Sequence, residues 1–106
     1  MSGRFEVPIV EREIEEYLVK QVKRAGGLCY KFTSGVRGVP DRIVIAPTSG
    51  VFFVELKRPK EKERKLQVYV QEQMRKHGAR VYSSVDSREK IDEIIRREFQ
   101  HGQDNK

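Results

Sequence analysis

The stretch RGVPDRIVIAPTSGVFFVELKRP, residues 37–59, contains two apolar runs separated by a short polar segment. The runs DRIVIA (41–46) and VFFVELKR (51–58) are rich in Val, Ile and Phe, which is typical of β-strands. The segment PTSG (47–50) has turn composition and predicts a tight connection. We therefore expect a β-hairpin.

Three charged residues lie in these strands, and charges are costly in a core unless something compensates them. Asp41 opens the first strand, and Glu55 and Lys57 lie on one face of the second, because side chains alternate with period two. In a hairpin, Asp41 lies at the same end as residues 55–57. Pro40 restricts the backbone before it and suits the first position of a strand, so we expect GVPD to hold Asp41 in a fixed direction.

The rest of the chain predicts further helices and strands around this hairpin. Helical periodicity marks three segments, and strand-like composition marks two more. The expected helices are 9–25, 66–78 and 88–99, and the expected additional strands are 28–33 and 79–85. The resulting order, α-β-β-β-α-β-α, predicts an α/β fold with a small mixed sheet flanked by helices. We expect a single domain at 9–99, an N-terminal arm at 1–8 and a polar tail at 100–106.

Composition limits the classes of function. The chain has 106 residues, of which 36% are charged, and its net charge of +6 suits a polyanionic partner or simply keeps the protein soluble. The single cysteine, Cys29, cannot form an internal disulfide, and no Cys/His cluster suggests zinc. No secretory signal and no run of about 20 apolar residues is visible, so we expect an intracellular protein with no membrane span.

The first predicted helix carries further carboxylates toward the sheet. Its apolar stripe consists of Ile14, Leu18, Val22 and Ala25. At about 100° per residue, Glu11 falls near the centre of this stripe and Glu15 near its edge. Clustered carboxylates repel one another and raise each other's pKa values, and Mg²⁺ or Mn²⁺ would relieve that cost. The alternatives are an ordinary Glu55–Lys57 ion pair and a solvated helix end.

The order of these motifs resembles the PD-(D/E)XK nuclease superfamily and, within it, the small stand-alone form of the VRR-NUC family. The stretches that carry the resemblance are EREIEEYLVKQVKRAGG, KFTSGVRGVPDRIVIAP, VFFVELKRP and LQVYVQEQMRKHGARVYSSVDS. They cover nearly all of residues 11–87. PD and ExK alone are weak patterns, whereas GVPD, ELK and a glutamine eleven residues before Gly78, in this order, are specific. The all-charged lead KEKERKL departs from the Gly/Ser-rich lead usual in the family.

The resemblance implies a restriction-endonuclease-like fold and Mg²⁺- or Mn²⁺-dependent hydrolysis of phosphodiester bonds in DNA. By position, it makes Asp41, Glu55 and the backbone carbonyl of Leu56 the metal ligands and Lys57 the motif lysine. Glu11, or Glu15 in its place, would serve as the first-helix glutamate and bind the metal through water or a second metal ion. Gln67 would be the glutamine that follows the motif. The expected catalytic residues are thus Asp41, Glu55, Lys57, Glu11 and Gln67.

Basic residues flank the motif and are expected to contact DNA phosphates. They are Lys31, Arg37, Arg58, Lys60 and Lys65. Because no base-reading element is apparent, a structure-selective enzyme is expected. A chain of 106 residues has little surface for gripping a branched duplex, so we expect a homodimer that presents two active sites. The resemblance implies an enzyme similar to a Holliday-junction resolvase, because small stand-alone members of the family resemble such enzymes. Ile9, Val10, Tyr69 and Val70 would suit either a dimer seam or the core. The alternatives are a catalytically inactive DNA-binding module of the same fold and a protein–protein adaptor.

Overall fold

The computed structural model describes residues 10–99, and the predicted element order is confirmed within them. The elements are α1 (Glu11–Arg24), β1 (Leu28–Lys31), β2 (Arg42–Ala46), β3 (Gly50–Leu56), α2 (Lys65–Lys76), β4 (Val81–Val85) and α3 (Arg88–Phe99). Most predicted elements extend one or two residues too far. The helices α1 and α2 end before Gly26 and Gly78, whose φ angles of 93° and 100° suit glycine and stop a helix. The proposed arm at 1–8 and tail at 100–106 lie outside the described residues.

The four strands form one mixed sheet in the order β1-β2-β3-β4. Strands β2 and β3 form the predicted antiparallel hairpin, which closes at the pair Ala46 and Gly50. Strand β4 runs parallel to β3, so the chain must cross over between them, and α2 forms that crossover. Strand β3 is a central strand of the sheet, since it pairs with β2 on one edge and with β4 on the other.

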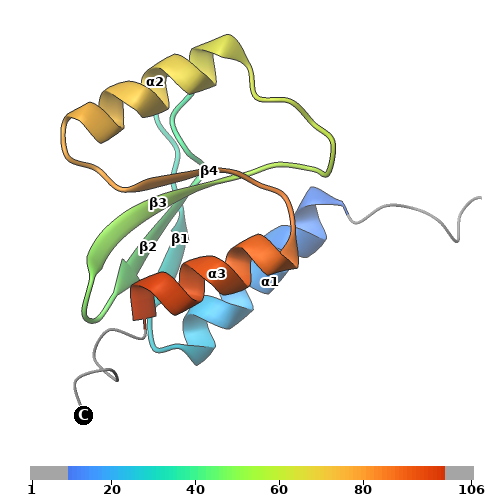
Figure 1. Ribbon diagram of the computed structural model, residues 1–106, viewed down its shortest axis with the longest axis vertical. Helices are drawn as coiled ribbons and strands as arrows, with labels where there is room; N and C mark the ends of the chain where they lie inside the picture. Colours follow the sequence, from blue (N-terminus) through green and yellow to red (C-terminus); the bar gives the residue numbers. More distant parts are fainter. Residues whose placement is uncertain (1–9, 100–106) are drawn as a thin grey trace, which may run out of the picture.

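The helices cover the two faces of the sheet unequally, as Figure 1 shows: α1 and α3 lie on one side and α2 on the other. The main core lies on the side of α1 and α3. It is built from buried aliphatic side chains of both helices against alternate residues of β2 and β3. These include Ile14, Leu18, Val22, Val44, Phe52, Val54, Leu56, Ile91 and Ile94. Because residues 52, 54 and 56 face this core, the side chains of Glu55 and Lys57 must point toward the side of α2.

The helix α2 has a different kind of interface with the sheet. Among residues 65–76, the only fully buried side chain is that of Gln71, which is polar. Hydrogen bonds from Gln67, Gln71 and Arg75 join this helix to β3, to β4 and to the loop before β2. Within residues 10–99, no helix has the length and apolar character needed to cross a membrane.

Candidate functional site

Asp41 and Glu55 meet at one end of the β2–β3 hairpin, as the sequence predicts. The register pairs Arg42 with Val54, so the residues just beyond that pair lie at the same end of the two strands. The backbone N–H of Leu56 donates a hydrogen bond to Oδ1 of Asp41 at 3.3 Å. The end of β3 is thereby tied to the loop that enters β2.

Glu55, Lys57 and Gln67 form a closed triangle of polar contacts. Nζ of Lys57 lies 3.3 Å from Oε2 of Glu55 and donates to Oε1 of Gln67 at 2.8 Å. Nε2 of Gln67 in turn donates to Oε2 of Glu55 at 3.0 Å. Glu55 is 5% exposed and Lys57 is 6% exposed, so the two charges stabilise each other away from water.

Gln67 also secures the start of α2. Its Oε1 accepts a hydrogen bond from the backbone N–H of Arg64 at 3.1 Å, which is one half of a capping box. The helix therefore begins at Lys65, within the charged stretch KEKERKL, without the Gly/Ser-rich lead usual in the family that the sequence resembles. One amide side chain both caps α2 and joins it to the charged end of β3.

A bulge in the pairing of β3 with β4 lies beside Glu55. Val54 pairs with Tyr82 and Leu56 with Val85, so β4 carries one extra residue over this interval. Ser84, within the bulge, has a φ of 56°. The N–H of Lys57 then donates to the carbonyl of Val85 at 3.0 Å. Bulges often re-aim side chains next to functional sites, and this one holds the backbone of residues 55–57 from the β4 side.

The electrostatics of the site disfavour two neighbouring carboxylate charges. Burial, and secondarily the charge of Asp41, raise the pKa of Glu55 to about 7, although the ammonium of Lys57 opposes this shift. Burial also raises the pKa of Asp41, against the hydrogen bond from Leu56. Perturbed carboxylates grouped in this way are common at functional sites.

The two glutamates of α1 differ in their surroundings. Glu11 is partly buried, and its pKa is raised first by burial and then by the charges of Asp41 and Glu61. Glu15 is committed to an ion pair with the buried guanidinium of Arg42. Within residues 10–99, no three His, Cys, Asp or Glu side chains are grouped closely enough to hold a metal ion, so Glu11 does not complete a three-residue cluster with Asp41 and Glu55.

The donor set nevertheless suits a hard divalent ion. Mg²⁺ is often held by only one or two carboxylates, with water and phosphate oxygens as the other ligands. Asp41 and Glu55 offer oxygen donors whose mutual repulsion a cation would relieve. In addition, Oε2 of Glu63 is buried without a hydrogen-bond partner, and the Glu63 charge contributes to the raised pKa of Glu55.

Three further residues contribute to the site region without having been singled out in the sequence. Glu63 lies in a run of alternating charges, Arg42 in an otherwise apolar strand, and Gln71 in the predicted helix 66–78. The alternation of β2 gives a signal for Arg42, since an arginine that shares a face with Val44 and Ala46 must be buried and needs a partner.

The predicted DNA-contacting residues all lie at the surface, on several elements. They are Lys31 at the end of β1, Arg37 before β2, Arg58 and Lys60 in the loop after β3, and Lys65 at the start of α2. Arg58 makes a surface ion pair with Glu61 at 3.8 Å. In Figure 1 the loop after β3 lies on the same side of the molecule as the start of α1.

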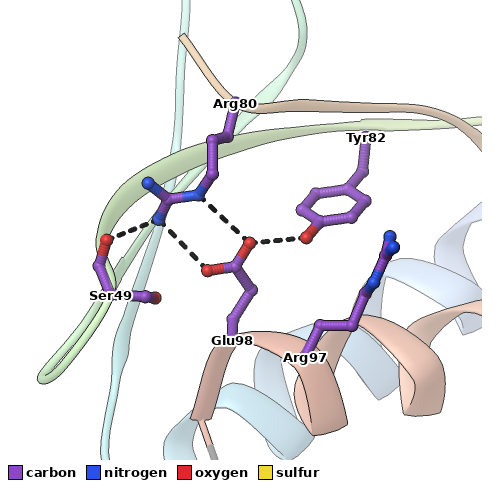
Figure 2. A pocket seen from close by; sticks show the side chains of 5 residues that line it. All are labelled: Ser49, Arg80, Tyr82, Arg97 and Glu98. Atoms are coloured by element: carbon purple, nitrogen blue, oxygen red, sulfur yellow. Dashed lines mark hydrogen bonds and ion pairs between the residues drawn. The ribbon is translucent and has the colours of Figure 1, made fainter. Parts of the chain in front are cut away.

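A pocket of about 410 Å³ lies near the opposite end of β3 and contains none of the candidate residues. Figure 2 shows Glu98 of α3 accepting hydrogen bonds from Arg80 and from the hydroxyl of Tyr82, with Arg97 alongside. Arg80 also donates to the carbonyl of Ser49 in the hairpin turn at 2.6 Å. The Glu98 carboxylate is thus already paired, and this network joins the turn, β4 and α3.

Comparison with known proteins finds a solved structure and a phage protein that are similar to this chain. A solved structure described as "VRR_NUC domain" superposes with a TM-score of 0.72 and 33% identity, over 80% of this chain and 92% of that one. "Putative nuclease p44" of Acyrthosiphon pisum secondary endosymbiont phage 1 is 53% identical over 55 residues. That match spans 51% of this chain and 59% of the phage protein. No family model matches the sequence.

The solved relative covers most of this chain and is itself almost fully covered, at an identity well above that of a fold-only likeness. The shared architecture is the restriction-endonuclease-like mixed sheet with flanking helices predicted from the sequence. The chain belongs to the VRR-NUC family.

Proposed function

We propose that the protein is a DNA endonuclease that hydrolyses phosphodiester bonds with the aid of Mg²⁺ or Mn²⁺. The observation that carries the proposal is the closed contact of Glu55, Lys57 and Gln67 beside Asp41 at the end of β3. A structural ion pair alone would not require a second, partly buried carboxylate next to it. Membership of the VRR-NUC family and the similarity to a phage protein named as a nuclease support the same reading.

Each side chain has a role in the proposed reaction. Asp41, Glu55 and the backbone carbonyl of Leu56 would hold the ion, and Glu11 would contribute through water. When bound, the ion supplies an acidified water and polarises the phosphate. Lys57 orients the attacking water and offsets negative charge that develops on the phosphate oxygens. Gln67 fixes the ammonium of Lys57 through its 2.8 Å hydrogen bond.

The substrate proposed is branched DNA, such as a four-way junction, cut by a homodimer. The exposed Lys31, Arg37, Arg58, Lys60 and Lys65 would contact phosphates, which fixes position on the duplex but reads no sequence. A symmetric dimer would present two sites to opposed strands. Among the residues suggested for its seam, Tyr69 is 63% exposed and Val10 is 40% exposed, Val70 is partly buried, and Ile9 lies outside the described residues.

The test compares wild-type protein with Lys57→Ala on labelled junction and linear duplex. We expect wild type to cut in Mg²⁺ or Mn²⁺ and not in EDTA, and Lys57→Ala to lose on the order of 10²–10³-fold in rate. Lys62→Ala is the matched control, because it removes the same charge from an exposed loop position and should cut like wild type. Cleavage by Lys57→Ala at the wild-type rate would refute the assignment.

Other outcomes of the same experiment separate the remaining readings. Binding of DNA without cutting in either metal would favour the inactive DNA-binding module. Equal rates on junction and duplex, or a monomeric mass by sedimentation at the working concentration, would remove the junction and dimer parts of the proposal while leaving the nuclease itself intact.

A further inference from the structure

Gln71 is a polar side chain in a place where apolar residues are normally found. It is 0% exposed and lies one helical turn after Gln67, so both amides lie on the same face of α2. A buried amide is costly unless its hydrogen-bonding groups find partners, so its contacts indicate what it does.

Both ends of the Gln71 amide are engaged by different segments of the chain. Nε2 donates to the backbone carbonyl of Gly38 at 3.1 Å. Oε1 accepts a hydrogen bond from the hydroxyl of Ser83 in β4. The side chain thereby joins α2 both to β4 and to the loop that leads into Asp41.

That loop is closely fitted against α2. Gly38 has a φ of 93°, and a Cβ at this position would lie 2.9 Å from the carbonyl oxygen of Leu66 and 3.1 Å from Cγ2 of Val70. Pro40 is fully buried and its ring limits the backbone. A segment held at Gly38 and Pro40 has little freedom left at Asp41, the next residue.

We propose that Gln71 is a positioning residue that fixes the loop 38–40 on α2 and so sets Asp41 relative to Glu55. Gln67, one turn earlier, contacts Glu55 and Lys57, so one face of α2 aligns both halves of the site. The expected effect of Gln71 on catalysis rests on the proposed function. The loop contact itself is independent of that function.

Two substitutions separate this role from a general role in anchoring α2. Gln71→Met keeps the length of the side chain and removes both hydrogen bonds. Ser83→Ala removes the bond to Gln71, and another to Arg75, but leaves the bond to Gly38 in place. A positioning role predicts that only the first substitution affects the loop.

The first measurement is hydrogen–deuterium exchange of the metal-free protein over residues 36–42. We expect faster exchange there in Gln71→Met and wild-type exchange in Ser83→Ala. Calorimetry with Mn²⁺ should give a dissociation constant about 10-fold higher for Gln71→Met. This is the low end of the effect of losing a direct contact to a metal ligand, because Gln71 holds the segment before Asp41 and not Asp41 itself. In cleavage assays kcat should fall with little change in KM for DNA. If Gln71→Met does not fold, Gln71→Asn, which is too short to span both partners, takes its place.

The inference is overturned if the Gln71 variant exchanges and binds Mn²⁺ like wild type, or if Ser83→Ala reproduces every effect of Gln71→Met. A wild-type protein that neither binds Mn²⁺ nor cuts DNA would refute the proposed function instead. In that case the exchange measurement still decides whether Gln71 holds the loop.

Discussion

Glu55 shows at the residue scale how a charge is accommodated at the end of a buried strand. Its carboxylate is nearly inaccessible, yet it is compensated by the ammonium of Lys57 and the amide of Gln67. The compensation is incomplete, because burial and Asp41 together raise the pKa of Glu55 to about 7. The protein therefore carries an electrostatic cost at this residue when no cation is bound.

That cost makes the stability of the metal-free protein depend on pH. Because the pKa of Glu55 is higher in the folded state than its ordinary 4.5, the folded state binds more protons between these values. Stability from this residue is therefore greatest below about pH 4.5, falls as the pH rises to about 7, and then levels off. The contribution of Glu55 to the free energy of unfolding is about 3 kcal/mol larger below this pH range than above it.

Urea unfolding in EDTA at about pH 5 and about pH 8 measures this effect. Glu55→Gln should reduce the loss of stability between the two conditions and should be more stable than wild type at the higher pH. Glu16→Gln, at an exposed position of α1, is the matched control and should behave like wild type. A Glu55→Gln variant with the full wild-type pH dependence would contradict the prediction.

At the element scale, helical periodicity alone does not decide which glutamate of α1 serves the candidate site. The packing of α1 on the sheet distinguishes the two candidates. Glu11 and Glu15 are one turn apart and both approach the sheet. Glu15 pairs with Arg42, which is buried on the face of β2 covered by α1, whereas Glu11 is influenced by the charge of Asp41. The same helix thus carries one glutamate that fastens it to the sheet and one that approaches the candidate site.

Replacing each glutamate with glutamine should affect a different property: stability at position 15 and the cleavage rate at position 11. Glu15→Gln leaves the buried Arg42 without its carboxylate and should lower the free energy of unfolding by about 2–3 kcal/mol, somewhat below a fully buried pair because Glu15 is partly exposed. Glu11→Gln should change stability little but slow cleavage at least tenfold, as expected for a residue acting near the ion. Denaturation and cleavage assays on both variants check this, and a destabilised Glu11 variant with normal specific activity would reverse the assignment.

At the scale of the whole molecule, the candidate site and the Glu98 network lie toward opposite ends of β3. The network ties together the hairpin turn, β4 and α3, and its charges are paired. The residues predicted to contact phosphates are exposed, and in sequence they flank the candidate-site residues at the other end of β3. Binding of a polyanion should therefore depend on that end of the protein.

The salt dependence of DNA binding tests this distribution of charge. Removing Arg37 and Lys60 together by alanine substitution should reduce the slope of log K against log salt by about 2, since each phosphate contact contributes about 0.9. Replacing Lys20 and Lys23 of α1, also exposed, removes the same charge and should leave the slope nearly unchanged. Equal slopes for the two double variants would mean that net charge alone drives binding.

Much of this architecture follows from local sequence. The alternation in residues 41–58 and the turn at 47–50 determine the hairpin, and that hairpin brings Asp41 to the end of the sheet that carries Glu55 and Lys57. Gly26 and Gly78 end two helices because their backbone conformations are unfavourable for other residues. These features depend on neighbours within one or two elements, so period and turn chemistry are enough to predict them.

The partners of individual side chains were decided by tertiary packing. Arg42 meets Glu15 from 27 residues away, and Gln71 meets Gly38 from 33 residues away. Glu63, in what resembles a solvated charged run, has a buried oxygen. Such contacts depend on how α1 and α2 are rotated and shifted on the sheet. That placement results from burial summed over many residues, and no short stretch of sequence contains it.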